Sequence, residues 1–402
     1  MPHIWALGVE TATTVLAVAG MGYYVAALLA AFVFLGRPRA RAAGARPGVS
    51  ILKSLKGLDP GMLEAFRTHC RQDYAGDFEL LLGVSSLQDA AAAAVRELQR
   101  EFPEREIRLV ECPERLGTNG KVSTLIQLLP HARYEYLLIN DSDITVGPHY
   151  LERVMAEFEA QATGDKLQAG ESRPVGLVTA LYRGRMHGTL GSRLESLGMS
   201  TDFIPAVLLA RWLEGGLRYG LGSTLAVTRE ALAAMGGLEA LKDQLADDYE
   251  LGARVYKAGY AVALSREVVE TSVPAYRWRD FVEHQLRWYR TVRDARPWGY
   301  AGFGFTFGLV WAALNVVASG VDLVSVWLLT LTLFLRLALA MAVGASVLYD
   351  RQVLENLWLL PVRDAVAMAM WVAGFAGDEI VWRGERFQVK DGKLSRTGSG
   401  ER

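Results

Sequence analysis

The stretch Tyr136-Leu-Leu-Ile-Asn-Asp141-Ser-Asp143 decides the expected fold. Its apolar residues are typical of a buried strand, and two carboxylates follow that strand directly. Parallel α/β sheets bind ligands beyond the carboxyl ends of their strands. Carboxylate oxygens at this spacing suit a hard divalent cation. A capped turn would also explain Asp-x-Asp, but the apolar run before it favours a cation site at a sheet edge.

The residues around this stretch alternate between short apolar runs and helical segments. This alternation predicts βαβ units and therefore an α/β, Rossmann-like fold with a mostly parallel sheet. Because strand ends meet at one edge, Asp59 and Asp141 are expected to lie near each other. The expected strands are 49–55, 78–84, 107–111 and 136–140, and the expected helices are 61–71, 90–101, 122–129 and 249–257.

The N-terminal end of the chain is apolar enough to cross a membrane. The segment 11–35 carries no charge, and about 20 apolar residues already span the ~30 Å hydrocarbon core. It lacks the cleavage site of a signal peptide, so a retained anchor is expected. By the positive-inside rule, the arginines after this segment place the following residues in the cytoplasm. These arginines are Arg37, Arg39, Arg41 and Arg46.

The C-terminal third contains three more apolar segments, 301–319, 321–348 and 357–375. Arg336 interrupts the second. Pro361 and its charged neighbours lie in the first half of the third, so a shorter interfacial or re-entrant helix is its alternative. Four full spans would place the C-terminal tail outside the cytoplasm, whereas its basic residues between 383 and 393 favour the cytoplasmic side. The side of the membrane on which the tail lies therefore stays open. The expected domains are an anchor (1–36), a cytoplasmic catalytic domain (47–295), membrane helices (300–380) and a polar tail (381–402).

Composition narrows the function classes. The 402 residues are 51% hydrophobic, and the formal net charge is −1. Nucleic-acid binding usually requires a basic excess, so nucleic acid is not an expected partner. The two cysteines, Cys70 and Cys112, lack metal-ligand spacing and are typical of a reduced, cytosolic setting. The Ala- and Arg-rich composition favours a bacterial inner membrane.

Polar residues after the expected strands are candidates for binding a nucleotide. Asp59, in Leu-Lys-Gly-Leu-Asp-Pro, lies where a base or ribose would bind, and Lys56 would meet phosphate charge. Asp89 is a similar candidate after the second strand. Lys121 begins an expected helix, where a phosphate is favoured. The alternatives are a helix cap or turn for Asp59 and an ordinary exposed lysine for Lys121.

Two further motifs supply chemistry downstream. Asp247-Asp248 opens an expected helix, where acids favour the helix dipole. A carboxylate there would also serve as a general base for an acceptor hydroxyl, which implies direct displacement and inversion. In His284-Gln-Leu-Arg287-Trp288, the arginine suits a pyrophosphate and the indole suits a sugar or acceptor. The alternative for this basic helix is contact with anionic headgroups.

Two other segments have open interpretations. His187, in a glycine-flanked loop, is either an acceptor-site residue or a solvated histidine. The segment 201–217 is dense in apolar residues but too short to span a membrane. It is either a core helix or an interfacial helix along which a lipid reaches the site.

These motifs, in this order, resemble the ceramide glucosyltransferase family, most closely its bacterial members associated with hopanoid biosynthesis. The resemblance runs from about Val49 to Trp288, and the arrangement of apolar segments extends it to most of the chain. The matching motifs are Lys56-Gly-Leu-Asp59-Pro60, Asp141-Ser-Asp143, Asp247-Asp248-Tyr249 and Arg287-Trp288, with His284 in place of the usual Gln or Arg.

The resemblance implies a glycosyltransferase A-type fold, a UDP-sugar donor, Mg²⁺ or Mn²⁺, inversion and a membrane-lipid acceptor. The motif's second acid, Asp248, would be the catalytic base, and Asp141 and Asp143 would hold the metal. The expected donor-binding residues are Lys56, Asp59, Asp89, Lys121, Asp141, Arg287 and Trp288, and the expected acceptor-side residues are His187, Asp247 and His284.

The expected reaction is transfer of one N-acetylglucosamine or glucose from UDP to a lipid hydroxyl, with a hopanoid polyol as acceptor and ceramide as the alternative. A processive polysaccharide synthase shares the motifs but usually needs more spans for an exit channel. A non-catalytic membrane scaffold is the third hypothesis, against which the retention of every acidic motif argues. The sequence leaves the sugar, the lipid, the metal and the oligomeric state open.

Overall fold

The chain divides into two compact units, each built from separate stretches of sequence. The computed structural model describes residues 2–40, 46–162, 173–382, 385–390 and 392–396. Arg41, named above, lies outside these ranges, as do residues 383, 384 and 391 of the basic tail segment. The helical unit comprises Met1–Arg37, Met186–Trp212 and Val273–Asp391, and the sheet unit comprises Pro38–Arg185, Leu213–Ser272 and Gly392–Arg402.

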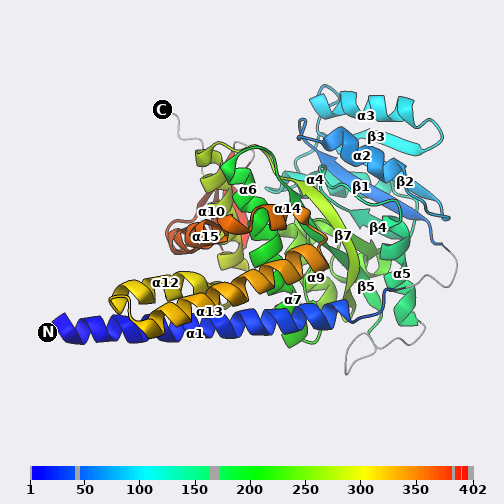
Figure 1. Cartoon of the computed structure of the whole chain (residues 1–402). Coiled ribbons are helices and arrows are strands. Elements are labelled where there is room, and N and C mark those ends of the chain that lie inside the picture. The colour runs from blue at the N-terminus through cyan, green and yellow to red at the C-terminus, as the bar shows by residue number, and fades with distance from the viewer. Residues whose placement is uncertain (1, 41–45, 163–172, 383–384, 391, 397–402) are drawn as a thin grey trace, which may run out of the picture. The chain divides into compact units, whose positions relative to one another are not determined.

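The sheet unit is built on a seven-stranded sheet in the order β3-β2-β1-β4-β6-β5-β7 (Figure 1). β1 pairs in parallel with β2 and β4, β2 with β3, and β5 with β7, whereas β6 is antiparallel to both neighbours. The prediction of a mostly parallel sheet is therefore confirmed. The strands are β1 (Val49–Leu55), β2 (Phe78–Val84), β3 (Glu106–Glu111), β4 (Tyr136–Ile139), β5 (Val175–Arg185), β6 (Leu225–Thr228) and β7 (Ala261–Ser272).

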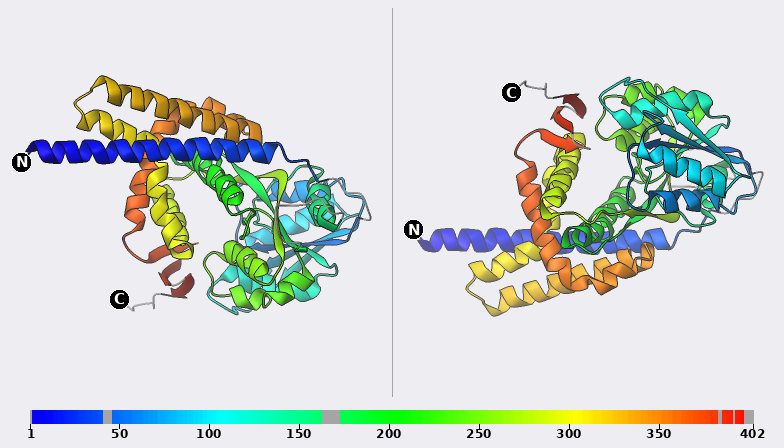
Figure 2. Two further views of the ribbon diagram at one scale, coloured as in Figure 1. Left: turned by 90° about the horizontal axis from the view of Figure 1, so that it is seen from below. Right: turned by 90° about the horizontal axis from the view of Figure 1, so that it is seen from above.

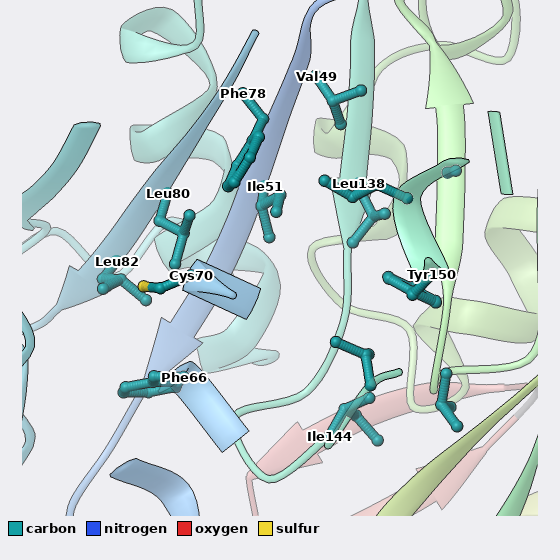
Figure 3. Close-up of a cluster of buried hydrophobic side chains, with 14 of the residues drawn as sticks. Val49, Ile51, Phe66, Cys70, Phe78, Leu80, Leu82, Leu138, Ile144 and Tyr150 are labelled. Carbon is teal, nitrogen blue, oxygen red and sulfur yellow. The ribbon is translucent and has the colours of Figure 1, made fainter. Parts of the chain in front are cut away.

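Helices cover this sheet and complete its core. Figure 3 shows Phe66 and Cys70 of α2 beside Ile51 of β1 and Leu80 of β2, all buried. The helices of the unit are α2 (Met62–Cys70), α3 (Ala90–Glu101), α4 (Gly120–Leu128), α5 (Tyr150–Ala162), α8 (Arg229–Ala234) and α9 (Asp247–Lys257), with short 3-10 turns at Leu129–His131 and Leu238–Leu241. The short strand β10 (Lys393–Arg396) joins the unit through Leu394 N, which donates to Asp243 O.

Local signals explain where these elements begin. The predicted bounds 49–55, 78–84 and 90–101 agree with β1, β2 and α3. α4 begins earlier than predicted because the Asn119 side chain caps it, accepting from Val122 N. α2 begins after Gly61, whose φ of 78° belongs to the left-handed region that glycine adopts readily.

The helical unit contains helices long and apolar enough to cross a membrane. Within the described residues there are three such segments, Leu7–Leu35, Leu323–Val347 and Leu357–Gly374, and a bent pair that would make a fourth. The candidate span 301–319 coincides with this bent pair, Pro297–Thr306 and Gly308–Ala318, whose axes differ by 52°.

Close packing and polar contacts join these helices. α1 (Pro2–Leu35) runs beside α12 (Gly308–Ala318) and α13 (Leu323–Ala340) (Figure 2). A Cβ on Gly20 would lie 2.2 Å from the Gly308 Cα, so only glycines permit this approach. Asn315 Nδ2 donates to the hydroxyls of Thr13 and Thr14. Such bonds satisfy polar groups that lipid cannot.

The ambiguous segment 201–217 is helical only to Leu213. Ile204 and Leu208 are buried, whereas Leu213 is 71% exposed, so the helix has both a core face and an exposed end.

The other elements are α6 (Leu190–Gly198), the π-helix η2 (Met199–Phe203), α7 (Ile204–Leu213), α10 (Trp278–Ala295), α11 (Pro297–Gly302), η4 (Phe303–Thr306), the π-helix η5 (Met341–Val347), α14 (Arg351–Glu355), η6 (Leu357–Leu359), α15 (Leu360–Gly374), β8 (Glu379–Trp382) and β9 (Glu385–Lys390).

Candidate functional site

The ends of β1 and β4 bring two predicted motifs together. These strands are parallel neighbours, so the loops that follow them leave the sheet at the same edge. Ser142 Oγ donates a hydrogen bond of 2.6 Å to Asp59 Oδ2. The N-cap residue of α2 is Gly61, and Asp59 lies in the turn before it, where its backbone carbonyl accepts from Met62 N. Asp59 is thus held beside the Asp-Ser-Asp loop, and its role in binding a nucleotide stays a prediction.

Asp141 and Asp143 have different surroundings. Asp141 is 48% exposed along its side chain. Asp143 Oδ2 accepts from Thr271 Oγ1 at 2.5 Å and from Ser272 N at 3.0 Å, which anchors this carboxylate to the end of β7. Burial, and then the charge of Asp141, raise the pKa of Asp143. One carboxylate is therefore fixed and the other is more accessible.

The carboxylate pair fits a divalent cation only as part of a larger ligand set. No group of three or more His, Cys, Asp or Glu side chains in the described parts of the chain is placed to hold a metal. Carboxylate oxygens are nevertheless the ligands that Mg²⁺ and Mn²⁺ prefer, and substrate phosphates commonly complete such sites. A cation would also relieve the repulsion between Asp141 and Asp143.

Lys121 connects the two acidic motifs. Its Nζ lies 2.8 Å from Asp141 Oδ1 and 3.2 Å from Asp247 Oδ2. Burial alone would lower the pKa of Lys121, but the charges of Asp141 and Asp247 outweigh it and raise the pKa. The alternative of an ordinary exposed lysine is wrong, because the side chain is 18% exposed and ion-paired. Its contact with a phosphate stays a prediction.

The acids that open α9 also differ from each other. Asp247 is 8% exposed and accepts from Asn119 Nδ2 at 3.3 Å, besides pairing with Lys121. Asp248 is partly buried and accepts from the backbone N of Tyr249 at 2.8 Å. Burial, and then the charge of Asp247, raise the pKa of Asp248 to about 6. A carboxylate with a pKa closer to neutrality is a better general base.

The loop 219–222 packs against these acids and was missed by sequence reasoning. A Cβ on Gly222 would lie 2.9 Å from Asp248 Oδ2, and a Cβ on Gly252 would lie 2.0 Å from Gly220 N. The rings of Tyr219 and Tyr249 stack with their centroids 5.4 Å apart. The closely spaced glycines in Tyr-Gly-Leu-Gly were the available signal.

Lys56 belongs to the loop after β1, and Asp89, which follows β2, contacts that loop. Asp89 Oδ1 caps α3 by accepting from Ala91 N, and it also accepts from Gly57 N, both at 2.9 Å. Asp89 therefore holds the Lys56–Asp59 loop in place, while donor binding by its carboxylate stays a prediction. Lys56 is exposed at the end of β1.

A buried lysine under the Asp-Ser-Asp loop was also missed. Lys53 is 0% exposed, and its Nζ donates to Asn140 Oδ1 at 2.5 Å and to the Asp141 carbonyl at 2.9 Å. Burial lowers the pKa of Lys53 to about 7, against the charges of Asp143 and Asp141. The available signal was a charged residue on the same face of the expected strand as Ile51 and Leu55.

The remaining predicted residues lie in the helical unit. His284 Nδ1 lies 3.0 Å from Glu195 Oε2, and its ring is 5.4 Å from Tyr276 and 5.6 Å from Trp288, centroid to centroid. Glu195, which is 3% exposed, was not predicted. Arg287 lies on α10 with His284 and Trp288, and His187 N donates to Ser192 Oγ at 2.8 Å. The binding roles of these residues stay predictions.

The chain is similar to known proteins in sequence and in fold. A family model described as Glycosyl transferase family 21 matches residues 12–395. Ceramide glucosyltransferase 3 of Caenorhabditis elegans is 24% identical over 60% of this chain and 50% of its own length. Ceramide glucosyltransferase of Komagataella phaffii is 29% identical over 33% of this chain and 27% of its own length. The chain thus spans at most about half of these relatives.

A solved structure shows the fold. The mannosyltransferase PcManGT from Pyrobaculum calidifontis, in complex with GDP-Man and Mn²⁺, aligns with a TM-score of 0.54 and 21% identity, covering 91% of this chain and 99% of its own. This likeness shows a glycosyltransferase A-like α/β domain with a mostly parallel sheet.

Proposed function

The chain belongs to glycosyl transferase family 21, and from that premise we propose that it transfers a single sugar from a UDP-sugar to the hydroxyl group of a membrane lipid. One observation carries the proposal. The contacts of Lys121 with Asp141 and Asp247, and of Ser142 with Asp59, gather three acidic motifs at one edge of the sheet. This edge is where open α/β sheets bind their ligands.

The donor would bind through residues at the ends of β1 and β4. Asp59 and Asp89 would contact the nucleoside, and Lys56 and Lys121 the diphosphate. Asp141 and Asp143 would hold Mg²⁺ or Mn²⁺, which neutralises charge on the leaving diphosphate when bound. From the motif alone, we propose that Arg287 makes a bidentate contact to the phosphates and that Trp288 offers a flat surface for the sugar.

Transfer would proceed by direct displacement with inversion. Asp248 accepts the proton of the acceptor hydroxyl as its oxygen attacks the anomeric carbon. The bond between that carbon and the phosphate oxygen breaks, and UDP leaves. Lys121, beside Asp141, would then pair with the negative charge of the departing diphosphate. The raised pKa of Asp248 supports its assignment as the base, and Asp247, paired with Lys121, is less available for this role.

The acceptor would be a lipid with a polar, hydroxyl-bearing end. Helices of membrane-span length support a membrane protein, and the curated relatives are named for ceramide. We infer a hopanoid polyol as acceptor with N-acetylglucosamine or glucose as the sugar, and ceramide as the alternative. His187, Asp247 and His284 would line the acceptor side. The catalytic domain would face the cytoplasm of a bacterial inner membrane.

The proposal is tested with purified protein in detergent. The protein is incubated with Mn²⁺ or Mg²⁺, a panel of UDP-sugars, and either a hopanoid polyol or a ceramide, and products are identified by mass spectrometry. One sugar added to one lipid is the expected result, and the lipid modified decides between the two acceptors. A polymer of sugars, or no product from a folded protein with any donor, would contradict the proposal.

A further inference from the structure

The feature that the proposed mechanism leaves unused is the ammonium group of Lys53. Ile51, Lys53 and Leu55 share one face of β1, because side chains alternate along a strand. That face packs on α2, and Lys53 Nζ lies 5.9 Å from the centroid of the Phe66 ring. Burying an ammonium group in such a core is costly, so a compensating role is expected.

A chain of hydrogen bonds fixes which atoms of His69, Asn140 and Lys53 donate and which accept. His69 Nδ1 lies 2.9 Å from the Ala65 carbonyl, which can only accept, so this nitrogen carries the proton. His69 Nε2 then accepts from Asn140 Nδ2 at 3.0 Å. The amide oxygen of Asn140 is left to accept from Lys53. Hydrogen bonds thus run from His69 of α2, through Asn140 at the end of β4, to the Lys53 ammonium, and they leave the ammonium facing the Asp-Ser-Asp loop.

The last bond of this chain reaches the candidate donor site. Lys53 Nζ donates to the backbone carbonyl of Asp141 at 2.9 Å, so the positive charge lies directly beneath the loop that carries both carboxylates. Asp143 and Asp141 are the anionic groups that most stabilise the charged lysine. A bound nucleoside diphosphate would add further negative charge above the same loop.

We propose that Lys53 is a positioning residue that serves the donor diphosphate through the Asp141–Asp143 loop, as a buried counter-charge. This inference rests on the proposed function. It predicts different effects on two ligands. A positive charge beneath the loop opposes binding of Mn²⁺ alone but favours binding of the anionic nucleotide. A group that only stabilised the fold would affect both ligands in the same direction.

The test compares Lys53→Met with Lys53→Arg in the full chain in detergent. Binding of Mn²⁺ alone is measured by electron paramagnetic resonance, binding of UDP in saturating Mn²⁺ by calorimetry, and the melting temperature by scanning calorimetry. For Lys53→Met we expect UDP affinity to fall about tenfold. We expect Mn²⁺ affinity to be unchanged or higher, and the melting temperature to fall modestly, because Asn140 Oδ1 and the Asp141 carbonyl lose their donor. Lys53→Arg, if folded, should recover part of the UDP affinity.

A second variant protects the test against misfolding. His69→Phe removes the support of Asn140 but keeps the lysine charge, so UDP affinity should fall less than in Lys53→Met. Equal losses in Lys53→Met and His69→Phe, unchanged UDP affinity in Lys53→Met, or parallel losses of Mn²⁺ affinity and melting temperature would overturn the inference. The binding measurements need no turnover, so wild-type protein that binds UDP without transferring sugar would contradict the proposed function alone.

Discussion

Both units of the molecule bury charged side chains, but they balance those charges differently. In the helical unit, Arg336 is 2% exposed and makes two hydrogen bonds to Asp364, from Nε at 2.9 Å and from a terminal nitrogen at 2.7 Å. Asp202 of the π-helix η2 pairs with Arg336 at 2.5 Å and with Arg363 at 3.1 Å. Two arginines thus meet two aspartates, and this cluster is neutral.

The sheet unit holds an excess of negative charge instead. Four carboxylates at its candidate site face two ammonium groups, Lys53 and Lys121. The four are Asp141, Asp143, Asp247 and Asp248. A neutral cluster among membrane-length helices satisfies its own members and joins the helices. An unbalanced cluster at a sheet edge has charge left for a cation and a substrate. Charge balance, rather than burial, is the difference between these two clusters, and it supports the functional role proposed for the second.

The largest expected effect comes from neutralising the proposed base. Asp248→Asn should lower kcat by roughly 10² to 10⁴ because no carboxylate then accepts the acceptor proton. The melting temperature should not fall, since the change removes a partly buried charge. Initial rates and scanning calorimetry check both statements. Glu250→Gln, on the same helix in a surface pair with Arg254, is the matched control. Near-normal turnover in Asp248→Asn would rule out the assigned base.

The neutral cluster should respond in the opposite way. Arg336→Met leaves Asp364 buried without its main partner, which typically costs about 3–5 kcal/mol of unfolding free energy. Adding Asp364→Leu should recover much of that loss, because the unpaired charge is then gone. Denaturant unfolding in detergent measures both variants. If the single variant were as stable as the wild type, the structural role of the Arg336–Asp364 pair would have to be abandoned.

The pH dependence of turnover distinguishes the functional cluster further. A base with a pKa of about 6 is active only when deprotonated, so kcat/KM, which reports the free enzyme, should be level above this pH. Below it, kcat/KM should fall about tenfold per pH unit as the carboxylate is protonated. Asp248→Asn should remove this limb from the profile. A profile that falls only near pH 4 in the wild type would show that Asp248 has an ordinary pKa or is not the base.

The smallest expected effect concerns the space beside Asp248. In Gly222→Ala the new Cβ would lie 2.9 Å from Asp248 Oδ2, so the carboxylate or the loop must shift. We expect kcat to fall about threefold to tenfold, with a loss of about 1 kcal/mol in stability. Gly120→Ala, where a Cβ would meet nothing within 4 Å, is the control. Equal activity in both variants would show that the loop 219–222 does not constrain the base.

Much of the fold could be predicted because its signals are local. Val49–Leu55 and Phe78–Val84 are apolar runs bounded by polar loops, and Ala90–Glu101 is an alanine-rich helix behind the cap Asp89. The motif order also indicated the family. The break at Phe307 was not predicted, although glycines at positions 302, 304 and 308 were a local signal for it.

Sequence patterns alone predicted β1 to β4 with the helices between them, the acidic motifs and the membrane-length segments, since hydrophobic period, caps and charge are properties of neighbouring residues. Only the tertiary structure decided the partners. Lys121 could have met solvent or phosphate, and it pairs with Asp141 and Asp247. Lys53 looked like one charge in a strand, and it binds the carbonyl of a residue 88 positions away. The physical reason is that the charge balance of the site depends on which strand ends the sheet order places together. Residues that meet in this way are far apart in the chain, so no local sequence pattern predicts their contacts.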